Sequence, residues 1–291
     1  MAAPKEAASP LLEKVRALLE DLKMPTARRA VGDLWDEALR QGLDGLDFLH
    51  RLLDKEAVEQ HDKRLARRIT ESRLPGEVKT LEGFDWAFPK TIDKGRVLGL
   101  AHLDFLRDRL NVIVTGKSGT GKSHLAQALG FLACGANKRV RYTSCAAMLG
   151  DLYAGLADHT LERRLRRYQR PELLIIDDLG TEKVEILHGQ GASFFFKVVN
   201  FRYGKASTII TSNLDRDAWD DYFGDPNVTV AALDRLTHHA IPVIIDGESY
   251  RVHQMEARMQ GAREEKAAEK PKKKSQGSRK GASGKSRGED T

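Results

Sequence analysis

The stretch GKSGTGKS at residues 116–123 constrains this chain more than any other feature. It matches the pattern G-x-x-x-x-G-K-[ST], in which glycines let backbone N–H groups turn inward around a phosphate. The pattern assigns Lys122 to the β- and γ-phosphates of a nucleotide and the Ser123 hydroxyl to magnesium. The apolar run 111–115 predicts a buried strand before the loop, and residues 124–133 predict a helix after it. The expected phosphate-binding residues are Gly116, Lys117, Ser118, Gly119, Thr120, Gly121, Lys122 and Ser123.

Composition sets the broad class of the protein. With 291 residues and 41% hydrophobic content, the chain can bury one large core and a small second one. No run approaches the roughly eighteen apolar residues of a membrane span and no signal peptide opens the sequence, so we expect a cytoplasmic protein without membrane contact. The net charge of +6 is uneven, because residues 256–291 hold eleven Lys/Arg against six Asp/Glu.

The chain divides into two folded parts and two tails. Residues 1–10 are predicted to be disordered. Three leucine-rich stretches with helical spacing then indicate a small all-helical domain over 11–75. Pro75 and Gly76 mark its boundary with a larger domain at 76–255. The tail 256–291 is rich in Lys, Glu, Ser and Gly and is predicted to be basic and disordered.

Strands and helices alternate after the phosphate loop. Strands are expected at 139–144, 173–176, 206–211 and 241–245, in addition to 111–115. This alternation predicts an α/β fold with a parallel five-stranded sheet and helices on both faces. The helices between the strands are expected at 145–156, 160–169, 193–203, 215–222 and 231–240.

Two acids follow the fully apolar strand 173–176. Acids at the carboxyl end of such a strand lie beside the crevice where open α/β sheets bind ligands. We expect Asp177 to hold magnesium, usually through water, and Asp178 to act as the base toward the attacking water. The strand 139–144 precedes this one in sequence, an order typical of the additional-strand ATPases. Asn213, after strand 206–211, could orient the lytic water, although a plain turn would explain it equally well.

The order of these motifs resembles the IstB-type helper ATPases of insertion sequences. These are AAA+ proteins related to the DnaA initiators and the DnaC helicase loaders. The resemblance covers about residues 11–251. Its segments are the phosphate loop, LLIIDDLG at 173–180, STIITSNL at 207–214, FGDP at 223–226, LDRLTHHA at 233–240 and GESYR at 247–251.

The resemblance implies a P-loop AAA+ ATPase that uses ATP and magnesium. It implies a homo-oligomer that assembles on double-stranded DNA, deforms it and delivers it to a partner transposase. By the same resemblance, Asp177 binds magnesium, Asn213 is the polar sensor, and Arg235, near the start of the helix 231–240, completes the site of a neighbouring subunit. Lys122 and Asp178 complete the implied catalytic set.

Some residues depart from the family pattern. Asp178 stands where the family usually has Glu, and its shorter side chain predicts slower hydrolysis. Lys117 and Ser118 stand where the family usually has prolines. Arg251 is a weak candidate for a sensor arginine in a C-terminal lid.

Two basic segments are candidates for DNA contact. The helix 160–169 and the end of the third N-terminal helix both concentrate arginines, which suits contact with a phosphate backbone. Solvated surface charge explains the first segment too, and a packing module explains the second. The arginines concerned are Arg163, Arg164, Arg166 and Arg167 in the first segment, and Arg64, Arg67 and Arg68 in the second.

Three functions remain open from the sequence. The first is the ATP-dependent DNA-remodelling helper of transposition. The second is a DnaC-like loader whose N-terminal domain binds a replicative helicase. The third is an ATP-switched DNA-binding module in which Asp178 barely supports hydrolysis.

Overall fold

A computed structural model of the chain describes residues 10–181, 190–215 and 218–268. Its centre is a parallel sheet of five strands in the order β2-β3-β4-β1-β5, which confirms the predicted α/β fold. Since β4 lies between β1 and β3, the strands that lead into the phosphate loop and the acid pair end on either side of β4. The strands are β1 (Asn111–Gly116), β2 (Val140–Ser144), β3 (Leu173–Leu179), β4 (Ser207–Ser212) and β5 (Ala240–Ile245).

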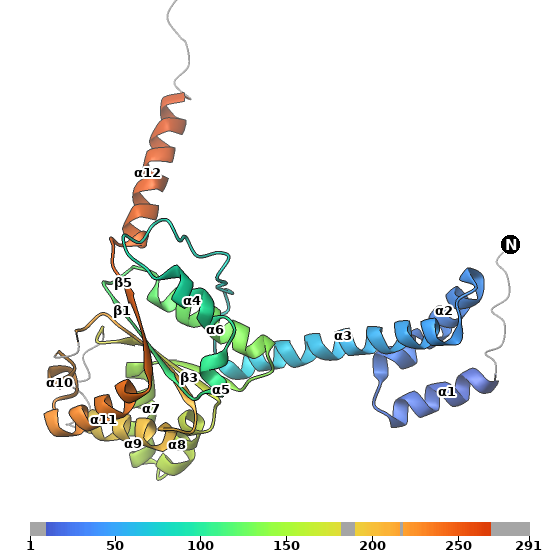
Figure 1. Cartoon of the computed structure of the whole chain (residues 1–291), viewed down its shortest axis with the longest axis horizontal. Coiled ribbons are helices and arrows are strands. Elements are labelled where there is room, and N and C mark those ends of the chain that lie inside the picture. The colour runs from blue at the N-terminus through green and yellow to red at the C-terminus, as the bar shows by residue number, and fades with distance from the viewer. Residues whose placement is uncertain (1–9, 182–189, 216–217, 269–291) are drawn as a thin grey trace, which may run out of the picture.

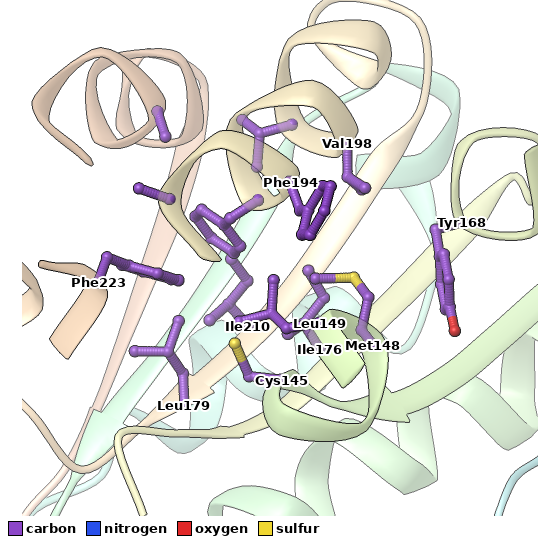
Figure 2. Close-up of a cluster of buried hydrophobic side chains, with 14 of the residues drawn as sticks. Cys145, Met148, Leu149, Tyr168, Ile176, Leu179, Phe194, Val198, Ile210 and Phe223 are labelled. Atoms are coloured by element: carbon purple, nitrogen blue, oxygen red, sulfur yellow. The ribbon is translucent and has the colours of Figure 1, made fainter. Parts of the chain in front are cut away.

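Helices cover both faces of the sheet. Leu173 and Ile175 of β3 belong to the core on one face, while Leu174 and Ile176 belong to the core on the other. Figure 2 shows the second core, where side chains of the covering helices gather over Ile176. The first face packs against α4 (Lys94–Leu100), α5 (Asp104–Arg107) and α6 (Lys122–Gly135), and the second against α7 (Cys145–Ala157), α8 (Leu161–Gln169), α9 (Gly191–Arg202), α10 (Ala218–Phe223) and α11 (Pro226–His238).

Three helices precede the sheet domain, as predicted. They are α1 (Pro10–Asp21), α2 (Pro25–Gln41) and α3 (Gly45–Ser72). A small core of their own includes Leu19, Val31 and Leu52. Figure 1 shows α1 and α2 at the far end of α3, well away from the sheet. The predicted disorder of residues 1–10 lies outside the described residues, except that α1 already begins at Pro10.

The long helix α3 belongs to both parts of the molecule. Leu52, in its first half, is in the N-terminal core, whereas Leu65 and Ile69 pack against the core under α6. Nε of Arg68 donates a hydrogen bond to Oδ1 of Asn137 at 3.1 Å. One helix therefore joins the N-terminal core to the core under α6.

The C-terminal region differs from the sequence prediction. Residues 256–268, expected to be disordered, continue the helix α12 (Tyr250–Ala268), which projects from the sheet domain (Figure 1). The physical reason is local: this stretch has no proline and one glycine, and is mostly built of strong helix formers such as Ala, Glu, Arg, Gln and Met. Residues 269–291 lie outside the described part. Among the described helices, none has the length and apolar character needed to cross a bilayer.

Candidate nucleotide site

The predicted phosphate loop connects β1 to α6. Gly119 and Gly121 have φ angles of +82° and +100°, which residues with a side chain rarely adopt. A Cβ at Gly121 would also lie 2.6 Å from Cε2 of Phe84, and one at Gly119 would lie 2.1 Å from Oγ of Ser249. The loop therefore needs glycine at these two positions for both its conformation and its close neighbours.

A cavity of about 500 Å³ opens beside this loop. Cavities of this size are typical of small-ligand sites. Its polar wall comes from the loop and the start of α6, and its aromatic wall from the connector before α4 and the start of α12. The residues that line it include Ser118, Gly119, Thr120, Gly121, Lys122, Ser123, His124, Phe84, Phe88, Asp178, Tyr250 and Arg251.

Lys122 places a cation at the bottom of the cavity. Its side chain is only 7% exposed, and its Nζ donates a hydrogen bond to the carbonyl of Lys117 at 2.7 Å. Burial lowers the pKa of the Lys122 ammonium, while the charges of Asp178 and Asp177 oppose this shift and Arg251 adds to it. The carboxylates of Asp177 and Asp178 and the guanidinium of Arg251 thus lie within electrostatic reach of Lys122.

Asp177 is buried and is not among the residues that line the cavity. It is 5% exposed, and both of its carboxylate oxygens accept hydrogen bonds: Oδ1 from the hydroxyl of Thr211 and Oδ2 from that of Tyr142. Sequence reasoning missed the roles of both residues. Tyr142 belongs to no motif, and Thr211 lies in STIITSNL but is not among the residues to which the resemblance assigns a function. The predicted strand at 139–144 was nevertheless a usable signal, because it adjoins the acid strand in the sheet.

Asp178 lines the cavity and has an unusual backbone. Its φ is +59°, its side chain is exposed, and Oδ1 accepts a hydrogen bond from Oγ1 of Thr181 at 2.5 Å. Its N–H donates to Oγ1 of Thr211 at 2.9 Å. Asp and Asn tolerate the left-handed conformation better than Glu does. This gives a physical reason for aspartate at a position where glutamate would be expected.

The residues present fit a nucleotide with magnesium. Ser123 and Asp177 offer hydroxyl and carboxylate oxygens, the donors that magnesium prefers, and nucleotide phosphates usually supply others. The loop N–H groups and the positive end of α6 suit phosphate oxygens. The aromatic wall of the cavity suits a base.

Comparisons with known proteins agree with this site. The model of the family described as IstB-like ATP binding protein matches residues 17–257. The chain belongs to this family. It is 37% identical over 241 residues to the insertion sequence IS21 putative ATP-binding protein of Pseudomonas aeruginosa, covering 83% of this chain and 89% of the relative. It is 32% identical to the insertion sequence IS232 putative ATP-binding protein of Bacillus thuringiensis subsp. berliner, covering 80% and 92%.

Solved structures confirm the fold class. A replication initiator DnaA bound to AMPPCP and single-stranded DNA aligns with a TM-score of 0.50 and 21% sequence identity. The alignment covers 65% of this chain and 56% of that one. At this identity the likeness concerns the fold alone.

Two residues that the family resemblance assigns to catalysis lie outside the described cavity lining. Asn213 is exposed after β4, and its Oδ1 lies beside Gly180, where a Cβ would come within 2.9 Å of it. Arg235 is in the last turn of α11, not near the start of a helix as expected, because Asp225 caps a helix that begins at Pro226. Its Nε donates to Oδ1 of Asn200 at 2.8 Å.

In this IstB-like chain, the connector before α4 contributes two aromatic residues, Phe84 and Phe88, to the site. Phe84 is buried in the sheet core and also lines the cavity. The ring of Phe88 lies 4.9 Å from that of Tyr250 and 5.0 Å from that of His253. Arg251, the candidate sensor arginine, follows Tyr250 and lines the same cavity. The start of α12 therefore forms part of the site.

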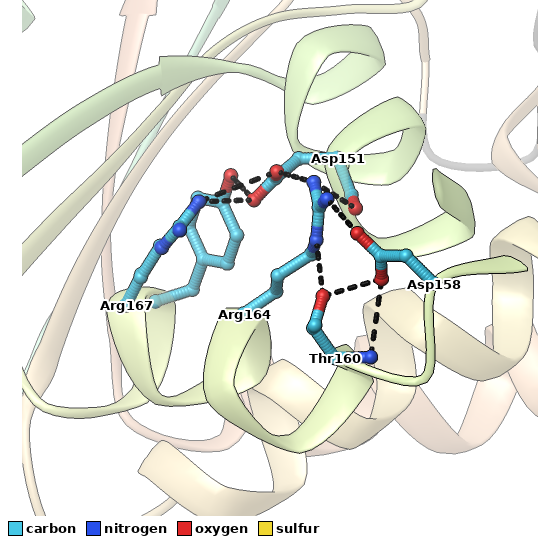
Figure 3. Close-up of polar contacts among 6 residues, drawn as sticks. Asp151, Asp158, Thr160, Arg164 and Arg167 are labelled. Atoms are coloured by element: carbon cyan, nitrogen blue, oxygen red, sulfur yellow. Dashed lines mark hydrogen bonds and ion pairs between the residues drawn. The ribbon is translucent and has the colours of Figure 1, made fainter. Parts of the chain in front are cut away.

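The arginines proposed for DNA contact fall into two groups. Arg164 is held within the chain, since its guanidinium binds Asp151, Asp158 and Thr160, and Arg167 also reaches Asp151 (Figure 3). In contrast, Arg163 and Arg166 are exposed on α8. On α3, Arg64 and Arg67 are both exposed, and Arg67 and Arg68 form ion pairs with Glu71 at 3.0 and 3.5 Å.

Proposed function

We propose that the chain binds ATP with magnesium, hydrolyses it, and assembles as a homo-oligomer on duplex DNA that it delivers to a partner transposase. One observation carries the proposal: the phosphate loop, Lys122 and Asp178 line a single cavity, with Asp177 buried within electrostatic reach of Lys122. Membership of the IstB-like family, whose relatives are named as ATP-binding proteins of insertion sequences, supports the biological setting.

The chain's own residues have separable roles in this proposal. Lys122 binds the β- and γ-phosphates, and the hydroxyl of Ser123 and the carboxylate of Asp177 hold magnesium, which neutralises charge on the phosphates. Asp178 lines the cavity at its exposed edge, where it accepts a proton from the attacking water. Asn213 orients that water from the end of β4.

DNA binding is proposed for the exposed arginines. Arg163 and Arg166 on α8 and Arg64 on α3 offer charges to phosphates, which position a duplex without reading its sequence. The polar contacts of Arg164 and Arg167 with Asp151 hold α8 on α7. They favour a supporting role for those two residues.

Steady-state ATP hydrolysis, measured with and without duplex DNA, tests the enzymatic part. We expect Lys122→Ala to lose nucleotide binding, and Asp178→Asn to bind ATP normally while kcat falls by about 10²-fold or more. Asn keeps the left-handed backbone, so the change isolates the carboxylate. Lys197→Ala, an exposed lysine on α9, is the matched control. Wild-type protein that binds ATP without hydrolysing it, on DNA or off it, would leave only a nucleotide-switched binding module.

The partner is tested by capture with the full chain. A transposase and a replicative helicase are offered in separate reactions, each with ATP and duplex DNA. The proposal expects retention of the transposase and not of the helicase. Retention of the helicase alone would identify a helicase loader instead.

A further inference from the structure

The Asp177 carboxylate is fixed by a side chain that belongs to no nucleotide-binding motif. We propose that Tyr142 is a positioning residue that orients Asp177 toward magnesium. This inference rests on the proposed function, because it takes the cavity to hold a nucleotide with magnesium.

The sheet register brings the two residues together. Ser144 of β2 pairs with Asp177 of β3, and Tyr142 pairs with Ile175. Register partners on neighbouring parallel strands point to the same face, and residues two apart on a strand share a face. Tyr142 and Asp177 therefore lie together on the face covered by α6. The Tyr142 hydroxyl donates its hydrogen bond to Oδ2 of Asp177.

The contact continues to the wall of the cavity. Nε2 of Gln127, on α6, donates a hydrogen bond to the Tyr142 hydroxyl oxygen at 3.3 Å. Gln127 itself lines the nucleotide cavity. These hydrogen bonds connect α6 to the Asp177 carboxylate through the Tyr142 hydroxyl. Because the hydroxyl oxygen accepts from Gln127, its own hydrogen is directed toward Asp177.

Both carboxylate oxygens of Asp177 accept a hydrogen bond, and each can still bind a metal. Oδ1 accepts from Thr211 while Oδ2 accepts from Tyr142. A carboxylate oxygen has two lone-pair directions, so each keeps one for a metal or a metal-bound water. A ligand fixed at both oxygens loses little freedom when the metal binds.

Removal of one hydroxyl tests the proposal. Outer-shell partners of metal ligands typically change metal affinity by about 10- to 100-fold. We expect Tyr142→Phe to weaken Mn²⁺ binding in the presence of saturating ADP by about 10-fold, measured by electron paramagnetic resonance. Affinity for ADP without any divalent metal should be unchanged. Tyr203→Phe is the matched control, since that phenol contacts Nδ1 of His238 at 2.7 Å, and neither residue lines the cavity.

A second pair of variants separates orientation from packing. Thr211→Val removes the other hydroxyl donor, and with it the acceptor of the Asp178 N–H, and should weaken Mn²⁺ binding. Thr211→Ser keeps the hydroxyl and should preserve Mn²⁺ binding. In an Asp177→Asn background, Tyr142→Phe should have no further effect on Mn²⁺ affinity. This comparison holds even if Tyr142→Phe lowers the melting temperature.

The outcomes separate the two proposals. Wild-type protein that binds no Mn²⁺ with ADP would overturn the proposed function and this inference with it. Wild-type protein that binds Mn²⁺ while folded Tyr142→Phe binds it equally well would overturn the positioning role alone. An equal loss from Tyr142→Phe in the Asp177→Asn background would also overturn it, because Tyr142 would then act independently of Asp177.

Discussion

Arg202 is the largest fully buried side chain among the described residues, and it carries a charge. Its guanidinium donates to the carbonyls of Tyr168 at 3.0 Å and Pro171 at 2.8 Å, and to Oγ1 of Thr208 at 3.0 Å. Burial lowers the pKa of Arg202 to about 9, which still leaves it charged at neutral pH. This one side chain holds the end of α8 and the turn before β3 against the start of β4.

Replacing Arg202 should therefore lower the stability of the sheet domain. Arg202→Met keeps the apolar stem but leaves several buried acceptors without a donor, each worth about 1–3 kcal/mol. We expect the free energy of unfolding, measured with urea, to fall by about 3 kcal/mol or more. Arg170→Met, an exposed arginine at the end of α8, is the control, with an expected change under about 0.5 kcal/mol. Equal losses from the two variants would contradict this account.

Residues of the candidate site could be predicted from the sequence only where they belong to a local pattern. The phosphate loop and the acid pair could be predicted because their chemistry depends on neighbouring residues. Tyr142 could not, because its contact with Asp177 depends on the register of two strands far apart in sequence. The pairing of Arg164 with Asp151 was missed for the same reason, since it depends on how α8 crosses α7.

Among the elements, α2 is capped by another helix. Pro25 occupies its first turn and Met24 offers no side-chain cap. Oε2 of Glu56, on α3, accepts hydrogen bonds from the N–H groups of Thr26 at 2.8 Å and Ala27 at 2.7 Å. Burial alone would raise the pKa of the Glu56 carboxyl, but these hydrogen bonds outweigh it and the net pKa is lowered.

This cap predicts an acid-dependent stability. The folded-state pKa of Glu56 lies below its unfolded value of 4.5, so its contribution is complete above that pH and is lost as pH falls through the folded pKa. We expect Glu56→Gln to lower the free energy of unfolding at pH 7 by about 2 kcal/mol. Unfolding in urea at decreasing pH should show the difference from wild type shrinking. A difference that stays constant into the acid range would exclude the charged cap.

The element α8 allows DNA contact to be separated from packing. Replacing Arg163 and Arg166 together with Gln should weaken binding to any duplex, and should reduce the slope of log affinity against log salt by about 2. Arg164→Gln is the comparison, and we expect it to lower the melting temperature, because Arg164 binds Asp151 and Asp158. A salt slope that Arg163→Gln/Arg166→Gln leaves unchanged would remove α8 from the DNA interface.

Most element boundaries could be predicted from periodicity, and the exceptions have local causes. The predicted strand 139–144 and the observed β2 differ by one residue at the start and none at the end. The helix expected at 231–240 begins five residues earlier, where Asp225 caps it and Pro226 opens it. The capping Asp225 and the opening Pro226 are both part of the segment FGDP at 223–226.

At the scale of the whole molecule, Arg235 lies away from the nucleotide cavity of its own chain. In this chain the Arg235 guanidinium lies 5.0 Å from the Phe196 ring and binds Asn200 and the carbonyl of Ala231, and Arg235 is not among the residues that line the cavity. It is also half-buried rather than hidden, so a neighbouring subunit can reach it. An arginine held this way is pre-oriented by its own chain, which suits a residue that stabilises charge on another chain's nucleotide.

We therefore expect Arg235 to act in trans. Arg235→Ala should bind ATP normally and lose DNA-stimulated hydrolysis by about 10³-fold or more, the typical effect of an arginine finger. Lys122→Ala should lose nucleotide binding. When the two variants are mixed, an intact Arg235 from the Lys122→Ala chain can face an intact nucleotide on the Arg235→Ala chain, so part of the hydrolysis should return. If mixed assemblies form on DNA and no ratio of the two restores hydrolysis, Arg235 does not act across the interface.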